Sequence, residues 1–140
     1  MNKLYYLSTC STCKKIIKRW SLNNSIKLID VKANPISKID LMELYNISNS
    51  FESLFNKRAQ LLRIRKIKCN ELSEKDFFNL ILEHYSFLKR PILLYNNKVF
   101  IIYKGNLYFF LPNKIPPVRC RQSSIVSKFK SSNIPSTEEL

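Results

Sequence analysis

No apolar run in the sequence approaches the roughly 18 residues of a membrane-spanning helix. The N-terminus has one basic residue, Lys3, and a short apolar run at 4–7, so it lacks the long apolar segment and cleavage site of a signal peptide. We therefore expect a cytoplasmic protein that makes no use of a membrane. In that compartment a close cysteine pair indicates a catalytic, redox-sensing or metal-binding role rather than structural cross-linking.

Glycine is almost absent and acidic residues are few. The 140 residues include one Gly and 10 Asp or Glu against 24 Lys or Arg, for a net charge of +14. Such a charge suits nucleic acid or an acidic partner. However, 17 Lys, 14 Asn and 16 Ile are the composition that an AT-rich coding bias produces. We therefore assign the charge to that bias and do not expect direct nucleic-acid binding.

The length and the apolar content of 45% predict one folded domain with a real hydrophobic core. Its distinctive feature is a pair of cysteines, Cys10 and Cys13, which lies between an apolar strand at 4–7 and a basic amphipathic helix at about 10–20. Residues three apart on a helix share one face, with Cβ atoms about 5–6 Å apart. Small adjustments bring such a pair into disulfide geometry.

The helix start predicts which of the two sulfurs reacts. Unpaired backbone N–H groups and the positive end of the helix dipole favour a thiolate at Cys10, and a lowered pKa distinguishes reactive from inert cysteines. Cys13 shares the face of Ile16, Ile17 and Trp20, so we expect it to be buried. The pattern thus predicts that Cys10 attacks and Cys13 resolves.

The rest of the chain continues the pattern of a small α/β domain. A β-like segment at 26–31 completes a β-α-β unit, which implies a parallel strand pair. A helical insertion at about 37–86 follows, with helix starts at Ser37 and Ser73 and a helical region from about Ser50 to Ile64. Residues 92–102 then predict a hairpin whose turn is Asn96-Asn97.

The remainder, 103–140, shows no long helical period. It begins with an aromatic stretch, continues through several prolines and ends in a Ser- and Lys-rich segment. We expect a divergent and partly disordered tail, particularly beyond about Gln122, because few apolar side chains remain there to offset the loss of chain entropy.

Four pieces of residues 3–100 resemble the arsenate reductase and Spx family of the thioredoxin superfamily. They occur in the family's order and spacing: Cys10-Ser-Thr-Cys13, Asn56-Lys57-Arg58, Leu82-Glu83-His84 and Lys89-Arg90-Pro91-Ile92. The resemblance implies a thioredoxin-like fold over 1–102 with an inserted helical lobe. It also implies that Pro91 is cis and faces the cysteine turn.

The resemblance further implies an oxyanion site without a bound cofactor. The matching positions are Cys10 as the attacking thiolate and Arg90 and Arg58 as oxyanion-binding residues, with glutathione or thioredoxin as the external thiol. Guanidinium groups suit tetrahedral oxyanions and stay charged, and they would favour the ionised form of Cys10. A third arginine of the best-known reductases has no counterpart here, so arsenate need not be the substrate.

Other roles compete for the same residues. A zinc site needs four ligands, and Cys69, Cys120 and His84 include no second close pair. We expect a structural role for His84, because the dipole at a helix C-terminus favours a histidine there. Arg58 fits a solvated helix face equally well. Cys120, between two arginines, would be reactive only if it were exposed.

Three functional hypotheses remain from the sequence. The first is an arsenate reductase-like thiol oxidoreductase acting on an oxyanion or a disulfide. The second is an Spx-like redox-sensing regulator that binds the RNA polymerase α subunit, with Cys10 and Cys13 as its switch. The third, suggested by the unmatched tail, is a decaying gene product that keeps the fold without activity.

Overall fold

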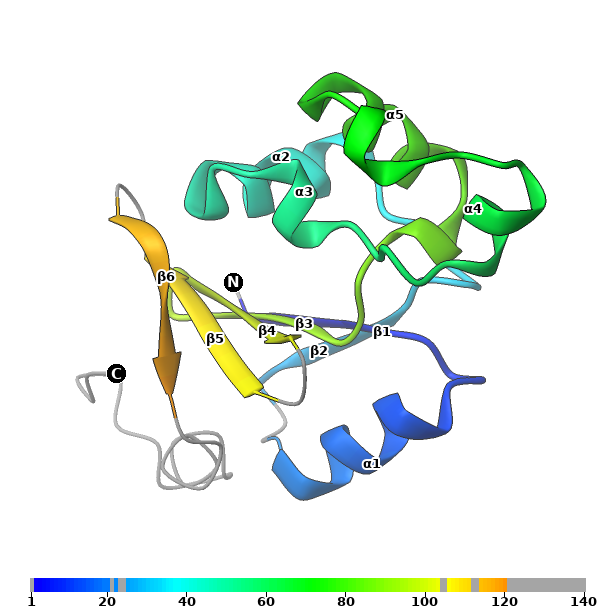
Figure 1. Ribbon diagram of the computed structural model, residues 1–140. Helices are drawn as coiled ribbons and strands as arrows, with labels where there is room; N and C mark the ends of the chain where they lie inside the picture. The colour runs from blue at the N-terminus through cyan, green and yellow to red at the C-terminus, as the bar shows by residue number, and fades with distance from the viewer. Residues whose placement is uncertain (1, 21, 23–24, 104–105, 112–113, 121–140) are drawn as a thin grey trace.

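The computed structural model describes residues 2–20, 22, 25–103, 106–111 and 114–120 (Figure 1). These residues form one sheet with a helix on one face and a helical lobe on the other. The helices are α1 Ser11–Trp20, α2 Lys38–Ser48, α3 Phe51–Leu54, α4 Gln60–Ile64 and α5 Glu74–Glu83, with 3₁₀ turns η1 Cys69–Glu71 and η2 Tyr85–Phe87. The strands are β1 Lys3–Tyr6, β2 Lys27–Asp30, β3 Ile92–Tyr95, β4 Lys98–Tyr103, β5 Asn106–Leu111 and β6 Lys114–Cys120.

The strands are arranged in the order β2-β1-β3-β4-β5-β6. Strands β1 and β2 are parallel, with Leu4 opposite Leu28, and the later pairs are antiparallel. The parallel pair follows from the β-α-β connection through α1. The predicted Asn96-Asn97 turn joins β3 to β4, and both residues have positive φ, 50° and 61°, which asparagine tolerates.

Alternating residues of the central strands face opposite sides of the sheet. On β3, Leu93 packs against α1, next to Trp20. Ile92 and Leu94 face the other side and pack against the helical lobe. Figure 1 shows the resulting three layers, with α1 below the sheet and α2 to α5 above it. Both faces of the central strands are therefore buried, as the continuous apolar run at 92–95 requires.

The lobe packs around aromatic side chains. Phe55 is fully buried, and its ring lies 4.8 Å from that of Phe77 and 5.6 Å from that of Phe87, measured between centroids. The predicted helix starts are confirmed, because the hydroxyls of Ser37 and Ser73 accept hydrogen bonds from the backbone N–H three residues later. Asp76 completes a capping box at the start of α5.

The predicted helical region from Ser50 to Ile64 is two short helices rather than one. The chain leaves the helix at Phe55, which forms an isolated antiparallel bridge with Leu88. The N–H of Asn56 donates to the carbonyl of Phe87 at 2.8 Å, and the N–H of Lys89 donates to that of Leu54 at 2.8 Å. This pairing with the segment that enters β3 replaces the helical hydrogen bonds.

The sheet continues past residue 102. Strands β5 and β6 lie next to β4 and extend the sheet away from β1, although the sequence analysis assigned no strands to 103–120. The tail predicted to be disordered beyond about Gln122 lies outside the described residues. Among the described residues, no helix has the length and apolar character needed to cross a membrane.

Candidate active site

The sulfur of Cys10 lies at the start of α1 and acts as its cap. The first helical hydrogen bond runs from the N–H of Lys14 to the carbonyl of Cys10 at 3.1 Å, which places Cys10 at the N-cap position. The N–H of Cys13 donates to the Sγ of Cys10 at 3.4 Å, the contact that a serine or aspartate cap accepts. A helix terminus that offers its free N–H groups to sulfur stabilises a thiolate.

The turn that carries Cys10 is fixed on its other side by β1 and β2. The N–H of Cys10 donates to the carbonyl of Leu7 at 3.0 Å. The N–H of Ser8 donates to a carboxylate oxygen of Asp30 at 3.2 Å. The hydrogen bonds to Ser8 hold the pKa of Asp30 below its usual value, so this carboxylate is a charged acceptor at neutral pH. The sulfur is thus placed by a strand, a helix and a loop together.

The surroundings of Cys10 favour its ionised form. Partial burial pulls its pKa upward, but hydrogen bonds from the backbone and the thiol of Cys13 and the positive charge of Arg90 outweigh burial, so the pKa is lowered overall. Cys10 is half-buried and unpaired with any other cysteine. It therefore combines a low pKa with access to solvent, the two properties of a reactive thiol.

Cys13 differs from Cys10 in both respects. It is fully buried, and burial, followed by the neighbouring charge of Cys10, raises its pKa to about 11. Cys13 therefore keeps its proton at neutral pH and donates it toward the sulfur of Cys10. The predicted difference between the two cysteines matches this geometry.

Arg90 lies in the segment that connects the helical lobe to β3. The Arg90–Pro91 peptide bond is cis, as the family resemblance implied. The Nη1 of Arg90 donates to the carbonyl of Ser86 at 3.2 Å and to that of Leu88 at 3.4 Å. These contacts hold the half-buried guanidinium near Cys10, where its positive charge lowers the pKa of the thiol.

Cys10, Arg58 and Arg90 line one cavity of about 1090 Å³. Its walls come from α1, from the segment after α3, from the segment before β3 and from strands β4 and β5. Five basic side chains line it: Arg19, Lys57, Arg58, Lys89 and Arg90. Among the described residues, Glu52 is the one acid in the lining, and it forms an ion pair with Lys57. The cavity therefore carries a net positive charge and suits an anionic ligand.

Apolar side chains also line the cavity. Ile16, Ile101, Tyr108 and Phe110 contribute to it. The lining therefore combines cationic and apolar side chains, so the cavity can accommodate an organic group as well as a small oxyanion.

Lys89 also lines the cavity, although in the sequence it stands out only as part of the Lys89-Arg90-Pro91-Ile92 motif. Burial, followed by the positive charge of Lys57, lowers its pKa to about 8, although Glu52 opposes this. Its place directly before Arg90 and Pro91 was the available signal. Its burial was not predictable, because it depends on the contact between the segment before β3 and the segment after α3.

Arg58 is exposed but lies in the lining of the same cavity as Cys10. Its backbone N–H donates to the side-chain oxygen of Asn56 at 3.1 Å. Arg58 therefore fits both interpretations. Its side chain is exposed to solvent, and it also lines the cavity.

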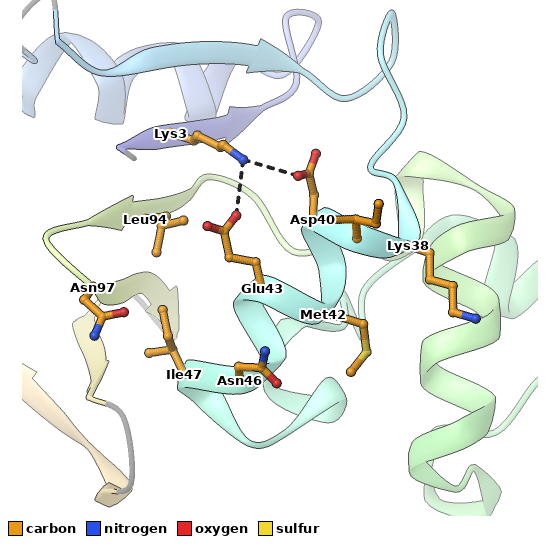
Figure 2. Close-up of a pocket in the computed structure, with 10 residues that line it drawn as sticks. Lys3, Lys38, Asp40, Met42, Glu43, Asn46, Ile47, Leu94 and Asn97 are labelled. Carbon is orange, nitrogen blue, oxygen red and sulfur yellow. Dashed lines mark hydrogen bonds and ion pairs between the residues drawn. The ribbon is translucent and has the colours of Figure 1, made fainter.

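A second cavity, of about 810 Å³, lies between α2 and the neighbouring strands β1 and β3 (Figure 2). In Figure 2 the ammonium of Lys3 bridges the carboxylates of Asp40 and Glu43, at 3.2 Å from each. Cys10, Cys13 and Cys69 do not line this cavity. Its ion pairs tie β1 to α2, and we assign it a structural role.

His84 and Cys69 do not line the cavity that contains Cys10. The Nδ1 of His84 accepts a hydrogen bond from the N–H of Ser86 at 3.0 Å, and its ring stacks on Tyr85, which fits the expected structural role. Cys69 is half-buried in η1. Cys120 ends β6, and its side chain lies outside the description. No three His, Cys, Asp or Glu side chains among the described residues lie close enough to hold a metal ion.

Comparison with known proteins gives one family and two groups of relatives. The model of the ArsC family matches residues 5–108. The chain is 25% identical over 129 residues to the global transcriptional regulator Spx of Streptococcus mutans, which covers 89% of this chain and 93% of the relative. It is 26% identical over 116 residues to global transcriptional regulator Spx 2 of Bacillus cereus, covering 80% and 88%. Coverage of 89% includes part of the segment after residue 102, which the sequence analysis could not match.

Solved structures share the fold. An ArsC family related protein from Bacteroides fragilis superimposes with a TM-score of 0.60 at 20% identity, covering 74% of this chain and 90% of that one. An arsenate reductase from Vibrio cholerae superimposes with a TM-score of 0.54 at 18% identity, covering 66% and 80%. The predicted α/β thioredoxin-like fold with a helical insertion is confirmed.

Proposed function

This chain belongs to the ArsC family, and from this we propose that it is an arsenate reductase-like thiol–disulfide oxidoreductase with Cys10 as its nucleophile. The observation that carries the proposal is the single cavity that contains the half-buried thiol of Cys10 and the guanidinium groups of Arg58 and Arg90. A thiolate needs a nearby cation to stay ionised, and an anionic substrate needs cations to bind. Arg90 lowers the pKa of Cys10, and in this proposal Arg90 and Arg58 together bind the anion.

The reaction begins at the sulfur of Cys10. With a disulfide substrate, the thiolate attacks one sulfur, a Cys10–substrate disulfide forms, and the other half of the substrate leaves as a thiolate with the electron pair. With an oxyanion such as arsenate, the sulfur attacks the central atom, and one oxygen leaves as water after taking up two protons. Arg90 and Arg58 balance the negative charge that the attacked group carries.

Cys13 or an external thiol completes the cycle. The thiolate of Cys13 attacks the sulfur of Cys10, a Cys10–Cys13 disulfide forms, and the reduced substrate leaves with the electron pair. Because the pKa of Cys13 is about 11, its proton must move to the departing group as the attack proceeds. Two external thiols, from glutathione or a thioredoxin, then reduce the disulfide and become oxidised to a disulfide themselves.

The test compares the wild-type protein with a Cys10→Ser variant. Purified protein is supplied with arsenate or a small disulfide and with a glutathione- or thioredoxin-linked reducing system, and consumption of the reductant is followed. We expect turnover by the wild type, none by Cys10→Ser, and the same thermal unfolding for both. Equal turnover by the two proteins would refute the proposal.

A second function is favoured by the regulators among the relatives. The alignment to the Spx of Streptococcus mutans covers most of both chains, and a switchable cysteine pair suits a redox sensor as well as an enzyme. In this alternative the chain binds the RNA polymerase α subunit, and Cys10 and Cys13 control the binding. Retention of the purified α subunit on immobilised protein, compared under oxidising and reducing conditions, tests it. No retention in either state would exclude it.

A further inference from the structure

Asn56 lies in the segment that carries Arg58, and its side chain contacts the segment that carries Arg90. Its side-chain Nδ2 donates to the carbonyl of Ser86 at 3.0 Å, and its Oδ1 accepts from the backbone N–H of Arg58 at 3.1 Å. Asn56 itself lines the cavity that contains Cys10. One amide group therefore contacts both the segment after α3 and the segment before β3.

The carbonyl of Ser86 is shared with Arg90. It accepts from the Nη1 of Arg90 at 3.2 Å and from Asn56 at 3.0 Å. The position of this carbonyl fixes the direction of the Arg90 guanidinium, because the second acceptor, the carbonyl of Leu88, lies at 3.4 Å. A displacement of the Ser86 carbonyl would therefore displace Arg90.

We propose that Asn56 is a positioning residue, which holds the guanidinium of Arg90 beside Cys10 and sets the spacing between Arg90 and Arg58. The part of this inference that concerns the spacing of the two arginines rests on the proposed function, in which they bind an anion together. Its first consequence, the control of the ionisation of Cys10 through Arg90, does not depend on any catalytic activity.

The chemistry of the amide explains why asparagine suits this position. The site requires a donor and an acceptor on one short side chain, and asparagine offers both. Serine could still accept from the N–H of Arg58, as in a turn of the Ser or Thr type, but it is too short to reach the carbonyl of Ser86. Alanine provides neither contact.

Backbone contacts that do not involve the side chain of Asn56 also join the two segments. The N–H of Asn56 donates to the carbonyl of Phe87, the N–H of Lys89 donates to that of Leu54, and Phe55 bridges Leu88. We expect these contacts to persist when the side chain is shortened, because none of them uses a side-chain atom of Asn56. Variants at Asn56 are therefore expected to fold, and thermal unfolding checks this.

The experiment measures how fast Cys10 is alkylated as a function of pH, with peptide mapping to identify the modified cysteine. It is carried out on the full chain as wild type, Asn56→Ala, Asn56→Ser and Asn79→Ala, the last being the same change at an exposed position on α5. A second series adds arsenate or phosphate and measures the concentration that halves the alkylation rate.

We expect both Asn56 variants to raise the pKa of Cys10 above the wild-type value, because both release the Ser86 carbonyl and with it Arg90. The half-protecting anion concentration should rise about tenfold in Asn56→Ala, the effect of losing one charge-assisted contact, and less in Asn56→Ser, which keeps the Arg58 contact. Asn79→Ala should match the wild type in both series.

The proposal is overturned if Asn56→Ala, folded as judged by its unfolding transition, has the wild-type pH profile. It is also overturned if Asn56→Ala still raises the pKa of Cys10 in an Arg90→Gln background, because the effect would then not act through Arg90. Should the wild type show neither turnover nor protection by anions, the proposed function fails. The pH profiles still decide the role of Asn56 in that case.

Discussion

The charged side chain of Lys89 should lower the free energy of unfolding, and Lys89→Met should raise it. The ammonium of Lys89 is half-buried in a cavity with four other basic side chains. Burial, with the charge of Lys57, lowers its pKa from 10.5 to about 8. Because the unfolded chain binds this proton more tightly, the charged lysine opposes folding at pH 7. Methionine has a similar length and carries no charge.

The size of the effect follows from the two pKa values. One pKa unit corresponds to about 1.4 kcal/mol, so a difference between 10.5 and about 8 amounts to about 3 kcal/mol of unfolding free energy at pH 7. Below pH 8 both states carry the proton and the cost is constant. Between pH 8 and 10.5 only the unfolded state keeps the proton, so the cost falls as the pH rises.

The assay is urea unfolding of wild type and Lys89→Met at pH 7, 8, 9 and 10. We expect Lys89→Met to be more stable by about 2–3 kcal/mol at pH 7, and we expect the difference to shrink steadily above pH 8. Lys75→Met, at an exposed position on α5, is the matched control and should show no such pH-dependent gain. A Lys89→Met protein no more stable than the wild type at pH 7, or a gain that does not change with pH, would refute the reasoning.

Three further predictions concern the lobe and the cysteine pair. Phe55→Ala should lower the free energy of unfolding by about 3–5 kcal/mol, measured in urea, because the fully buried ring packs between two others; a loss below 1 kcal/mol would contradict this packing. Ser73→Ala should cost about 1 kcal/mol in the same assay, because Asp76 then loses its partner in the capping box, and an unchanged midpoint would count against the cap. Alkylation at pH 8 with peptide mapping should modify Cys10 and leave Cys13 unmodified, since burial raises the pKa of Cys13 to about 11; equal labelling would be inconsistent with that burial.

The sequence predicted the parts of the fold that depend on local pattern. The strand, cysteine turn and helix at 4–20, the capped helices that begin after Ser37 and Ser73, and the Asn96-Asn97 hairpin all lie where the pattern placed them. Each depends on periodicity or on turn and cap residues within a few positions, which a single sequence contains.

Strands β5 and β6 were not predicted, for two physical reasons. Leu107 and Phe109 pack on the side of the sheet that α1 covers, and Phe110 packs against the lobe. Strand β5 is therefore buried on both faces and shows no alternation of apolar and polar residues. The segment 114–120 contains Pro116 and Pro117, and proline is disfavoured inside a sheet because it cannot donate a backbone hydrogen bond. At the edge of a sheet, where β6 lies, proline is tolerated because it need not donate to a neighbour.

The candidate site divides in the same way. Cys10 and Cys13 were identifiable from their place at a helix start, and Arg90 and Arg58 came from the family resemblance. Lys89 and Asn56 acquire their environments from the pairing of 54–56 with 87–89. No local pattern encodes that contact, so their roles became visible only in the folded chain.

The central claim is that Arg90 and the start of α1 keep the sulfur of Cys10 ionised. The most direct measurement is the pKa of Cys10, obtained from its alkylation rate against pH in the wild type and in Arg90→Gln. We expect a wild-type pKa below that of an ordinary thiol, and we expect this pKa to rise when the guanidinium is removed. A wild-type pKa at or above the ordinary value, unchanged in Arg90→Gln, would contradict it.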